Sequence, residues 1–185
     1  MTLIHQIMYK ISLFLNNPEF LRGFFDNRFY LILLVVVLMR MKYTTYSSMW
    51  MSALINIPGT FLHETMHYVV GLILNAAPCN FTLWPKKNLD GYYVMGSVGF
   101  RNVTFYNAIP AAMAPLLLLP IGFYINRYLL PVMVPTLFNY VLYVLLQTII
   151  IENAVPSRAD FNVAGMYFSG IVVYGIIGLF FLLAL

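Results

Sequence analysis

The chain has 185 residues, of which 62% are hydrophobic and only 9% are charged, and its formal net charge is +4 at pH 7. Soluble domains carry about 25% charged residues, so this composition argues against an ordinary water-soluble domain. The small positive charge is spread through an apolar chain. It fits membrane topology signals and argues against a nucleic-acid-binding protein.

Long uncharged runs predict an α-helical polytopic membrane protein. Residues 102–126, 128–151 and 161–185 contain no charged side chain over 24 or 25 positions. A helix needs about 20 residues to cross a bilayer. With two further hydrophobic stretches nearer the N-terminus, the sequence predicts five spans, at about residues 29–39, 46–75, 106–126, 132–151 and 162–185.

Two segments outside these spans have a different character. Residues 1–28 contain several charged side chains and are predicted to lie at the membrane interface, with an amphipathic segment over residues 1–15. Residues 78–105 contain two alternating, aromatic-rich runs separated by Asp90-Gly91, which predicts a β-hairpin or small sheet at the membrane surface between the second and third spans. The chain has no internal repeat, so residues 1–185 are predicted to form a single membrane-embedded domain.

The second predicted span contains a polar motif. Residues 61–70 read FLHETMHYVV, so His63, Glu64 and His67 lie within five positions of an otherwise apolar run. Pro58-Gly59 interrupts this hydrophobic stretch, and proline suits the first turn of a helix, so a kink is expected there, with the motif helix running from about Pro58 to Leu74. A purely structural interpretation is that these polar side chains form a cluster that packs helices together. However, ionisable side chains within a membrane are expensive and usually functional.

The spacing of this motif is typical of a zinc-dependent hydrolase. Residues four apart lie on one face of a helix, so His63 and His67 can bind one zinc ion. Glu64 then lies beside the metal, where it can act as general base towards a water whose pKa zinc lowers to about 7. The sequence therefore predicts Zn²⁺ as the cofactor.

A catalytic zinc site needs a third protein ligand, and the chain offers few candidates. Asp160 is the first, Glu152 the second, and His5 is a distant third. Asp160 also has a structural interpretation, because Ser157 and Asp160 have the spacing of a capping box that opens the last helix. Both interpretations of Asp160 remain open at this point.

The distribution of lysine and arginine predicts the orientation of the chain. If five spans alternate, seven basic residues lie on one side and three on the other, which places the N-terminus and the active site towards the cytoplasm, with the plasma membrane as the expected location. The first group contains Lys10, Arg22, Arg28, Lys86, Lys87, Arg101 and Arg158, and the second contains Arg40, Lys42 and Arg127. The HETMH motif and the downstream sequence PSRAD are then expected to converge at one end of the helix bundle.

With HETMH on a hydrophobic helix and NAVPSRAD far downstream, the chain resembles the site-2 protease family of intramembrane zinc metalloproteases, as a divergent, minimal member without a PDZ domain. This resemblance implies that His63, His67 and Asp160 bind zinc and that Glu64 is the general base. It also implies that Asn153 helps to position the substrate or the oxyanion. The β-rich loop that follows the motif helix in that family corresponds to residues 80–105 here.

The predicted function is hydrolysis of a peptide bond in a membrane-embedded or membrane-adjacent substrate. The expected partners are therefore a transmembrane or membrane-associated protein and the lipid bilayer, with no nucleic acid; the oligomeric state is left open. Two alternatives remain, which are a non-catalytic zinc-binding membrane protein and a membrane protease of the kind that processes prenylated proteins, with Glu152 as the zinc ligand. A transporter that uses these residues as a proton or metal relay is disfavoured by the absence of internal repeats.

Overall fold

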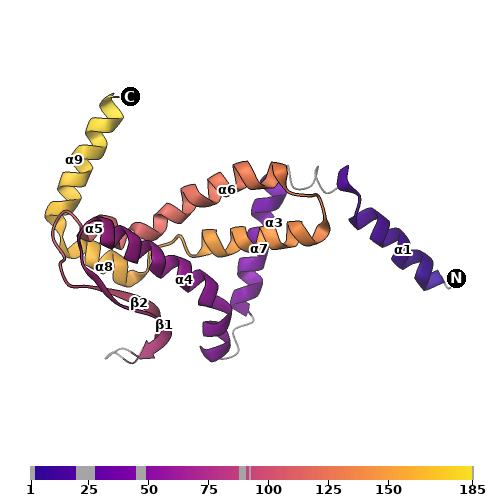
Figure 1. The fold of residues 1–185 in the computed structure, drawn as a ribbon, viewed down its shortest axis with the longest axis horizontal. Coiled ribbons are helices and arrows are strands. Elements are labelled where there is room, and N and C mark those ends of the chain that lie inside the picture. The colour runs from indigo at the N-terminus through magenta and orange to yellow at the C-terminus, as the bar shows by residue number, and fades with distance from the viewer. Residues whose placement is uncertain (1–2, 20–27, 45–48, 88–90, 92, 185) are drawn as a thin grey trace. The chain divides into compact units, whose positions relative to one another are not determined.

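A computed structural model describes the chain except for residues 1–2, 20–27, 45–48, 88–90, 92 and 185 (Figure 1). Its contacts divide the chain into two units, each built from two separate stretches of sequence. The first unit comprises Met1–Tyr46 and Gly122–Ile149, and the second comprises Ser47–Ile121 and Ile150–Leu185. The single-domain organisation of residues 1–185 stays a prediction.

The first unit consists of helices. It contains α1 (Leu3–Leu15), α3 (Arg28–Thr44), most of α6 (Leu118–Val132) and most of α7 (Leu137–Glu152). Its core is formed by four buried side chains, which are Val35, Tyr140, Tyr143 and Val144. The helix α1 lies within the predicted amphipathic segment of residues 1–15, whose interfacial location stays a prediction, and residues 20–27 lie outside the described residues.

The second unit is built around α4 (Met49–Ile73). The strands β1 (Pro78–Lys87) and β2 (Tyr93–Phe100) pack against α4, as do the short helix α5 (Ala108–Ala112) and the 3₁₀-helix η1 (Ala114–Leu117). The helix α8 (Arg158–Met166) packs against α5 and is followed by α9 (Phe168–Ala184). This arrangement places segments from three parts of the sequence around the polar motif on α4.

The helix that carries the motif begins earlier than the sequence predicts. It starts at Met49, and Pro58 lies inside it. The prediction of a helix start at Pro58 is therefore wrong. Proline removes one backbone donor from a helix but does not always end it, because neighbouring elements can hold the chain in place. Here α4 is in contact with both strands, α5 and η1.

The hairpin predicted over residues 78–105 is confirmed. β1 and β2 pair antiparallel, from Pro78 opposite Phe100 to Lys87 opposite Tyr93, with shifts in register between Cys79 and Pro85. The predicted turn residue Asp90 lies outside the described residues. Gly96 in β2 has a φ of +95°, a left-handed conformation that favours glycine.

The predicted architecture of five membrane spans is wrong. Among the described residues, only Ala114–Val132 forms a helix long and apolar enough to cross a membrane. A second span results only if α8 and α9, which are bent by 92° relative to each other, count as one broken span. An uncharged run in a sequence gives the length of an apolar segment, but it does not show where the helix within that segment is interrupted. The run over residues 106–126 is interrupted where α5 ends, and α7 has only 16 residues.

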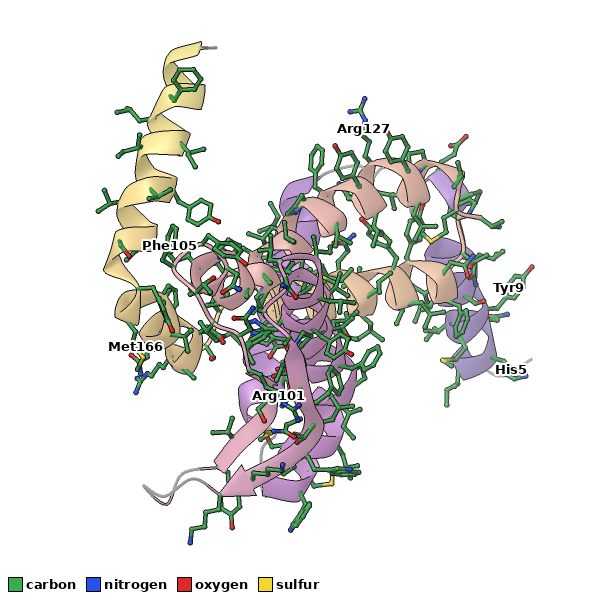
Figure 2. All side chains as sticks on the ribbon, turned by 60° about the vertical axis from the view of Figure 1, so that its left-hand side comes forward. His5, Tyr9, Arg101, Phe105, Arg127 and Met166 are labelled. Atoms are coloured by element: carbon green, nitrogen blue, oxygen red, sulfur yellow. The ribbon has the colours of Figure 1, made fainter. Side chains whose placement is uncertain are left out.

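Two of the remaining predicted spans fail for similar reasons. α3 has 17 residues and includes Arg40 and Lys42 in its last part. α4 has 25 residues, but it carries the polar motif and is not among the helices that are both long enough and apolar enough to cross a membrane. The apolar composition of the chain is nevertheless visible on its surface. Side chains of α9 project from several sides of that helix in Figure 2, and those of Ile176, Leu179 and Phe180 are more than half exposed.

Candidate metal centre

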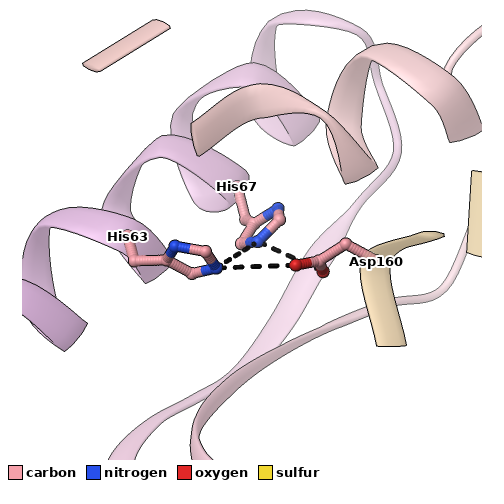
Figure 3. A group of neighbouring side chains, drawn as sticks. All are labelled: His63, His67 and Asp160. Atoms are coloured by element: carbon pink, nitrogen blue, oxygen red, sulfur yellow. Dashed lines mark hydrogen bonds and ion pairs between the residues drawn. The ribbon is translucent and has the colours of Figure 1, made fainter. Parts of the chain in front are cut away.

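The helix α4 presents the two histidines of the motif on one face. His63 and His67 are one helical turn apart, and their Nε2 atoms lie 3.2 Å from each other (Figure 3). His67 is buried, with 4% of its surface exposed. The helix geometry therefore directs both imidazoles to one point, as the spacing in the sequence predicts.

Asp160 reaches this point from the start of α8. Its Oδ2 lies 3.5 Å from His63 Nε2, and its Oδ1 lies 3.3 Å from His67 Nε2 (Figure 3). Among the described residues, these three side chains form the only group of three metal-binding types whose donor atoms all lie within 4.8 Å of one another. The expected convergence of HETMH and PSRAD is therefore found within the second unit.

Asp160 also closes the predicted capping box, which is confirmed. The Ser157 hydroxyl accepts a hydrogen bond from the Asp160 backbone N–H at 3.3 Å, and Asp160 Oδ2 accepts one from the Ser157 backbone N–H at 2.6 Å. The two interpretations of Asp160 from the sequence do not exclude each other, because a carboxylate has two oxygens and each can accept more than one bond. The cap fixes the carboxylate while leaving it directed at the imidazoles.

Backbone carbonyls determine which nitrogen of each imidazole faces Asp160. His63 Nδ1 lies 2.8 Å from the Asn153 carbonyl oxygen, and His67 Nδ1 lies 2.7 Å from the Ala111 carbonyl oxygen. A carbonyl can only accept, so both Nδ1 atoms carry a hydrogen and donate it. In the neutral imidazoles this leaves the Nε2 lone pairs directed at each other and at Asp160. Metal-binding histidines in proteins usually have this second hydrogen bond.

The three donor groups lie close enough together to surround a single metal ion. Zn–N and Zn–O bonds of about 2.0–2.2 Å at tetrahedral angles separate neighbouring ligand atoms by about 3.3–3.5 Å. The two Nε2 atoms lie 3.2 Å apart, and each lies 3.3 or 3.5 Å from a different oxygen of Asp160; with one donor atom from each residue, the three atoms lie within 4.8 Å of one another. When both Nδ1 atoms carry their hydrogens, the two Nε2 atoms and the Asp160 carboxylate oxygens are all acceptors. A further proton or a cation between these atoms is then needed to relieve the repulsion of their lone pairs. The donor set of two imidazoles and one carboxylate is one that zinc accepts.

The charges of the group shift the ionisation of its members. Burial acts to lower the pKa of the His67 imidazole, but the hydrogen bond and charge of Asp160 outweigh this effect and raise it. Burial acts to raise the pKa of the Asp160 carboxyl, but its hydrogen bonds with His63 and His67 hold that pKa well below its usual range. The Asp160 carboxylate and the His67 imidazole therefore each favour the charged form of the other.

Glu64 lies beside this group and not within it. Its side chain is buried, with 6% of its surface exposed. A Cβ atom added to Gly96 would lie 2.9 Å from Glu64 Oε1, so the backbone of β2 passes directly over the carboxylate. Burial raises the pKa of the Glu64 carboxyl, although the charges of His63 and His67 act in the opposite direction.

The other candidate ligands are not part of this group. Glu152 ends α7 and is absent from the group of three, which favours Asp160 over Glu152 as the third ligand. His5 is exposed on α1 in the first unit (Figure 2). Asn153 is present at the site, but the contact seen is made by its backbone carbonyl with His63. The role of its side chain towards a substrate stays a prediction.

Two contributions to the site are not visible in the sequence analysis. The Ala111 carbonyl that accepts from His67 is supplied by the backbone, so no side-chain pattern marks it. Gly96 had a readable signal, because an isolated glycine inside a strand often marks a bulge or the close approach of another chain segment. Here that segment is α4, through Thr60 and Glu64.

Comparison of the chain with protein-family models, with curated proteins and with solved structures found no match.

Proposed function

We propose that the chain is a zinc-dependent peptidase, with His63, His67 and Asp160 as the protein ligands and Glu64 as the general base. The observation that carries this proposal is the convergence of the HETMH histidines with Asp160 at separations of 3.2–3.5 Å. A zinc ion held there supplies a Lewis acid and an open position for water.

The residues of the chain have separate tasks in this proposal. Glu64 takes a proton from the attacking water and passes it to the amine nitrogen that leaves when the peptide bond breaks. Its raised pKa suits this exchange, because an acid–base group works best when its pKa approaches the working pH. Asp160 and the carbonyls of Asn153 and Ala111 hold the two imidazoles in place. The asparagine role implied by the family resemblance is proposed for Asn153.

A membrane-adjacent protein or peptide is the proposed substrate, and a membrane is the proposed location. The helical stretch Ala114–Val132 meets the length and composition of one span. Large apolar side chains on α9 are exposed, including Ile176, Leu179 and Phe180. Extended apolar surface of this kind is costly in water and is typical of contact with lipid or with another protein.

Zinc content and hydrolysis, measured together, test the proposal. Wild-type protein purified in detergent is compared with Asp160→Ala, Glu152→Ala and Glu64→Gln. We expect about one zinc per chain in the wild type, loss of that zinc with Asp160→Ala, and its retention with the other two substitutions. An internally quenched peptide library in the same detergent then reports hydrolysis, which Glu64→Gln should reduce by about 10²- to 10⁴-fold.

The possible results separate the alternatives. A wild-type protein that binds no zinc while folded would refute the metal centre. Zinc binding with equal hydrolysis by wild type and Glu64→Gln would remove the assignment of the general base. Zinc that is lost with Glu152→Ala and kept with Asp160→Ala would instead favour the alternative ligand set.

A further inference from the structure

Gly59 lies one helical turn before His63, on the same face of α4. A Cβ atom added to Gly59 would lie 2.0 Å from Asn153 Nδ2, 2.5 Å from its Cγ and 2.7 Å from its Oδ1. The side-chain amide of Asn153 therefore occupies the space that any other residue at position 59 would need. All three close atoms belong to the terminal amide of one side chain, so a methyl group at position 59 would displace that amide from its place on α4.

Asn153 thus touches α4 at two successive turns. Its side chain rests against Gly59, and its backbone carbonyl accepts the hydrogen bond from His63 Nδ1 at 2.8 Å. The next residue, Ala154, has no exposed surface, and its N–H donates to the Ile151 carbonyl. The turn after α7 is therefore held on α4 by a side chain at one point and by a carbonyl at the next.

We propose that Gly59 is a positioning residue for the metal centre: it admits the Asn153 amide, and the seated amide keeps the Asn153 carbonyl on His63 Nδ1. That hydrogen bond holds the Nδ1–H tautomer of His63, in which Nε2 is free to bind a metal. This inference rests on the proposed metal site for its functional meaning, but the structural coupling between Gly59 and His63 can be measured without a metal.

The substitution Gly59→Ala displaces the Asn153 amide from α4, and the inference expects the Asn153 carbonyl to lose its position on His63 Nδ1 as a result. The result expected is weaker zinc binding, by about 10- to 100-fold, which is typical when the second hydrogen bond of a metal-binding histidine is lost. The double variant Gly59→Ala/Asn153→Ala has room for the new methyl group, because the amide is absent. Its zinc affinity should equal that of Asn153→Ala alone, because both single substitutions remove the same seated amide, whereas independent losses of stability would add.

Two measurements keep this inference separate from the proposed function. The first is the affinity for Zn²⁺, measured by competition with a chelator in detergent solution. The second is a ¹H–¹⁵N spectrum of the histidine rings in the metal-free protein, which is simple because the chain has only three histidines. In the wild type His63 should appear as the Nδ1–H tautomer, and Gly59→Ala should shift it towards the Nε2–H tautomer.

Gly165→Ala is the matched control. Gly165 also lies in a helix, α8, but nothing lies within 4 Å of its added Cβ atom. This control should leave the zinc affinity and the His63 tautomer unchanged. An unchanged His63 tautomer in Gly59→Ala would overturn the inference whether or not the protein binds zinc. A double variant whose loss of zinc affinity is the sum of the two single losses would also overturn it. Absence of zinc binding in the wild type would refute the metal centre alone, since the tautomer still reports on Gly59.

Discussion

Ser157 and Asp160 share a reciprocal pair of hydrogen bonds at the start of α8, and the same Asp160 carboxylate faces the two imidazoles of α4. Asp160 Oδ2 lies 2.6 Å from the Ser157 backbone nitrogen and 3.5 Å from His63 Nε2. The Asp160 side chain therefore serves both as part of the helix cap and as a candidate metal ligand. The local structure of α8 consequently affects the geometry of the metal centre.

Substitution of Ser157 by alanine should destabilise α8 while leaving the metal centre largely intact. The change removes the hydroxyl that accepts from the Asp160 N–H, and loss of such a cap costs about 1 kcal/mol of unfolding free energy. The backbone bond from Ser157 N–H to Asp160 Oδ2 does not depend on the side chain. Denaturant unfolding in detergent should show this loss, and Ser157→Thr should restore most of it. A full loss of zinc in Ser157→Ala would contradict the view that the backbone bond alone holds the carboxylate.

Gly96 and Gly91 offer a matched pair for testing how closely β2 approaches Glu64. Both have left-handed backbones, with φ of +95° and +84°. Alanine at Gly91 meets no atom within 4 Å, so it should cost only the strain of that conformation, about 1–2 kcal/mol. Alanine at Gly96 would meet Thr60 Cγ2 at 2.4 Å and Glu64 Oε1 at 2.9 Å, which should add about 1–3 kcal/mol of overpacking.

The two glycine variants should also differ in activity. Gly96→Ala displaces the Glu64 carboxylate, so hydrolysis should fall while zinc content stays at the wild-type level. Gly91→Ala should retain hydrolysis at close to the wild-type rate. Equal losses of stability and of activity in the two variants would mean that β2 does not press on Glu64.

Zinc affinity should increase with pH in the range where His67 loses its proton. Asp160 raises the pKa of His67, so in the metal-free protein this pair stabilises the fold fully below the unfolded-state pKa of about 6.5 and is lost as pH rises through the folded-state pKa. The pKa of Asp160 is lowered, so its contribution is present above its unfolded-state value of about 3.9 and is lost as pH falls through the folded-state pKa. Zinc must displace the His67 proton, which costs affinity at low pH.

Titrations with Zn²⁺ at several pH values test this expectation. Below the folded-state pKa of His67, affinity should fall by about tenfold for each pH unit, because one proton is released on binding. The stability that zinc adds should therefore be larger at pH 8 than at pH 6. Asp160→Asn removes the negative charge that holds the proton, so its zinc affinity should be lower overall but should depend less on pH near neutrality. A zinc affinity independent of pH between 6 and 8 would contradict the assignment of His67 as a ligand.

The sequence predicts the chemistry of the site better than the architecture around it. The HETMH spacing fixes the two imidazoles on one helix face through local geometry alone. The Ser157–Asp160 cap is also local, and the structure contains it. In contrast, the Ala111 carbonyl on His67 joins residues 44 positions apart and depends on a backbone atom that every residue has. Such a contact follows from tertiary packing and leaves no pattern in the sequence.

The error in the number of spans has a related cause. Hydropathy records which residues are apolar, but it does not record where a helix stops. The break at Met113 and the bend between α8 and α9 divide stretches that read as continuous in the sequence. Pro58 gives the opposite error, since it was expected to begin a helix and lies inside one. In both cases tertiary contacts decide whether the helix ends at a residue that allows an interruption.

The single cysteine of the chain provides a test of membrane location and orientation. Cys79 is a free, partly buried residue in β1, on the strand pair that packs against α4, so it reports on the side that carries the metal centre. The predicted cytoplasmic orientation was derived from five alternating spans, which the structure does not have, and it therefore needs direct measurement.

We expect the protein to stay in the membrane pellet after alkaline extraction. A membrane-impermeant maleimide, applied to intact cells and to inverted vesicles, then shows on which side of the membrane Cys79 lies. Cys79→Ser controls for non-specific labelling, and labelling after denaturation shows that the thiol is reactive. Labelling in intact cells would place the site on the outer face, and release by alkaline extraction would refute the proposed span at Ala114–Val132.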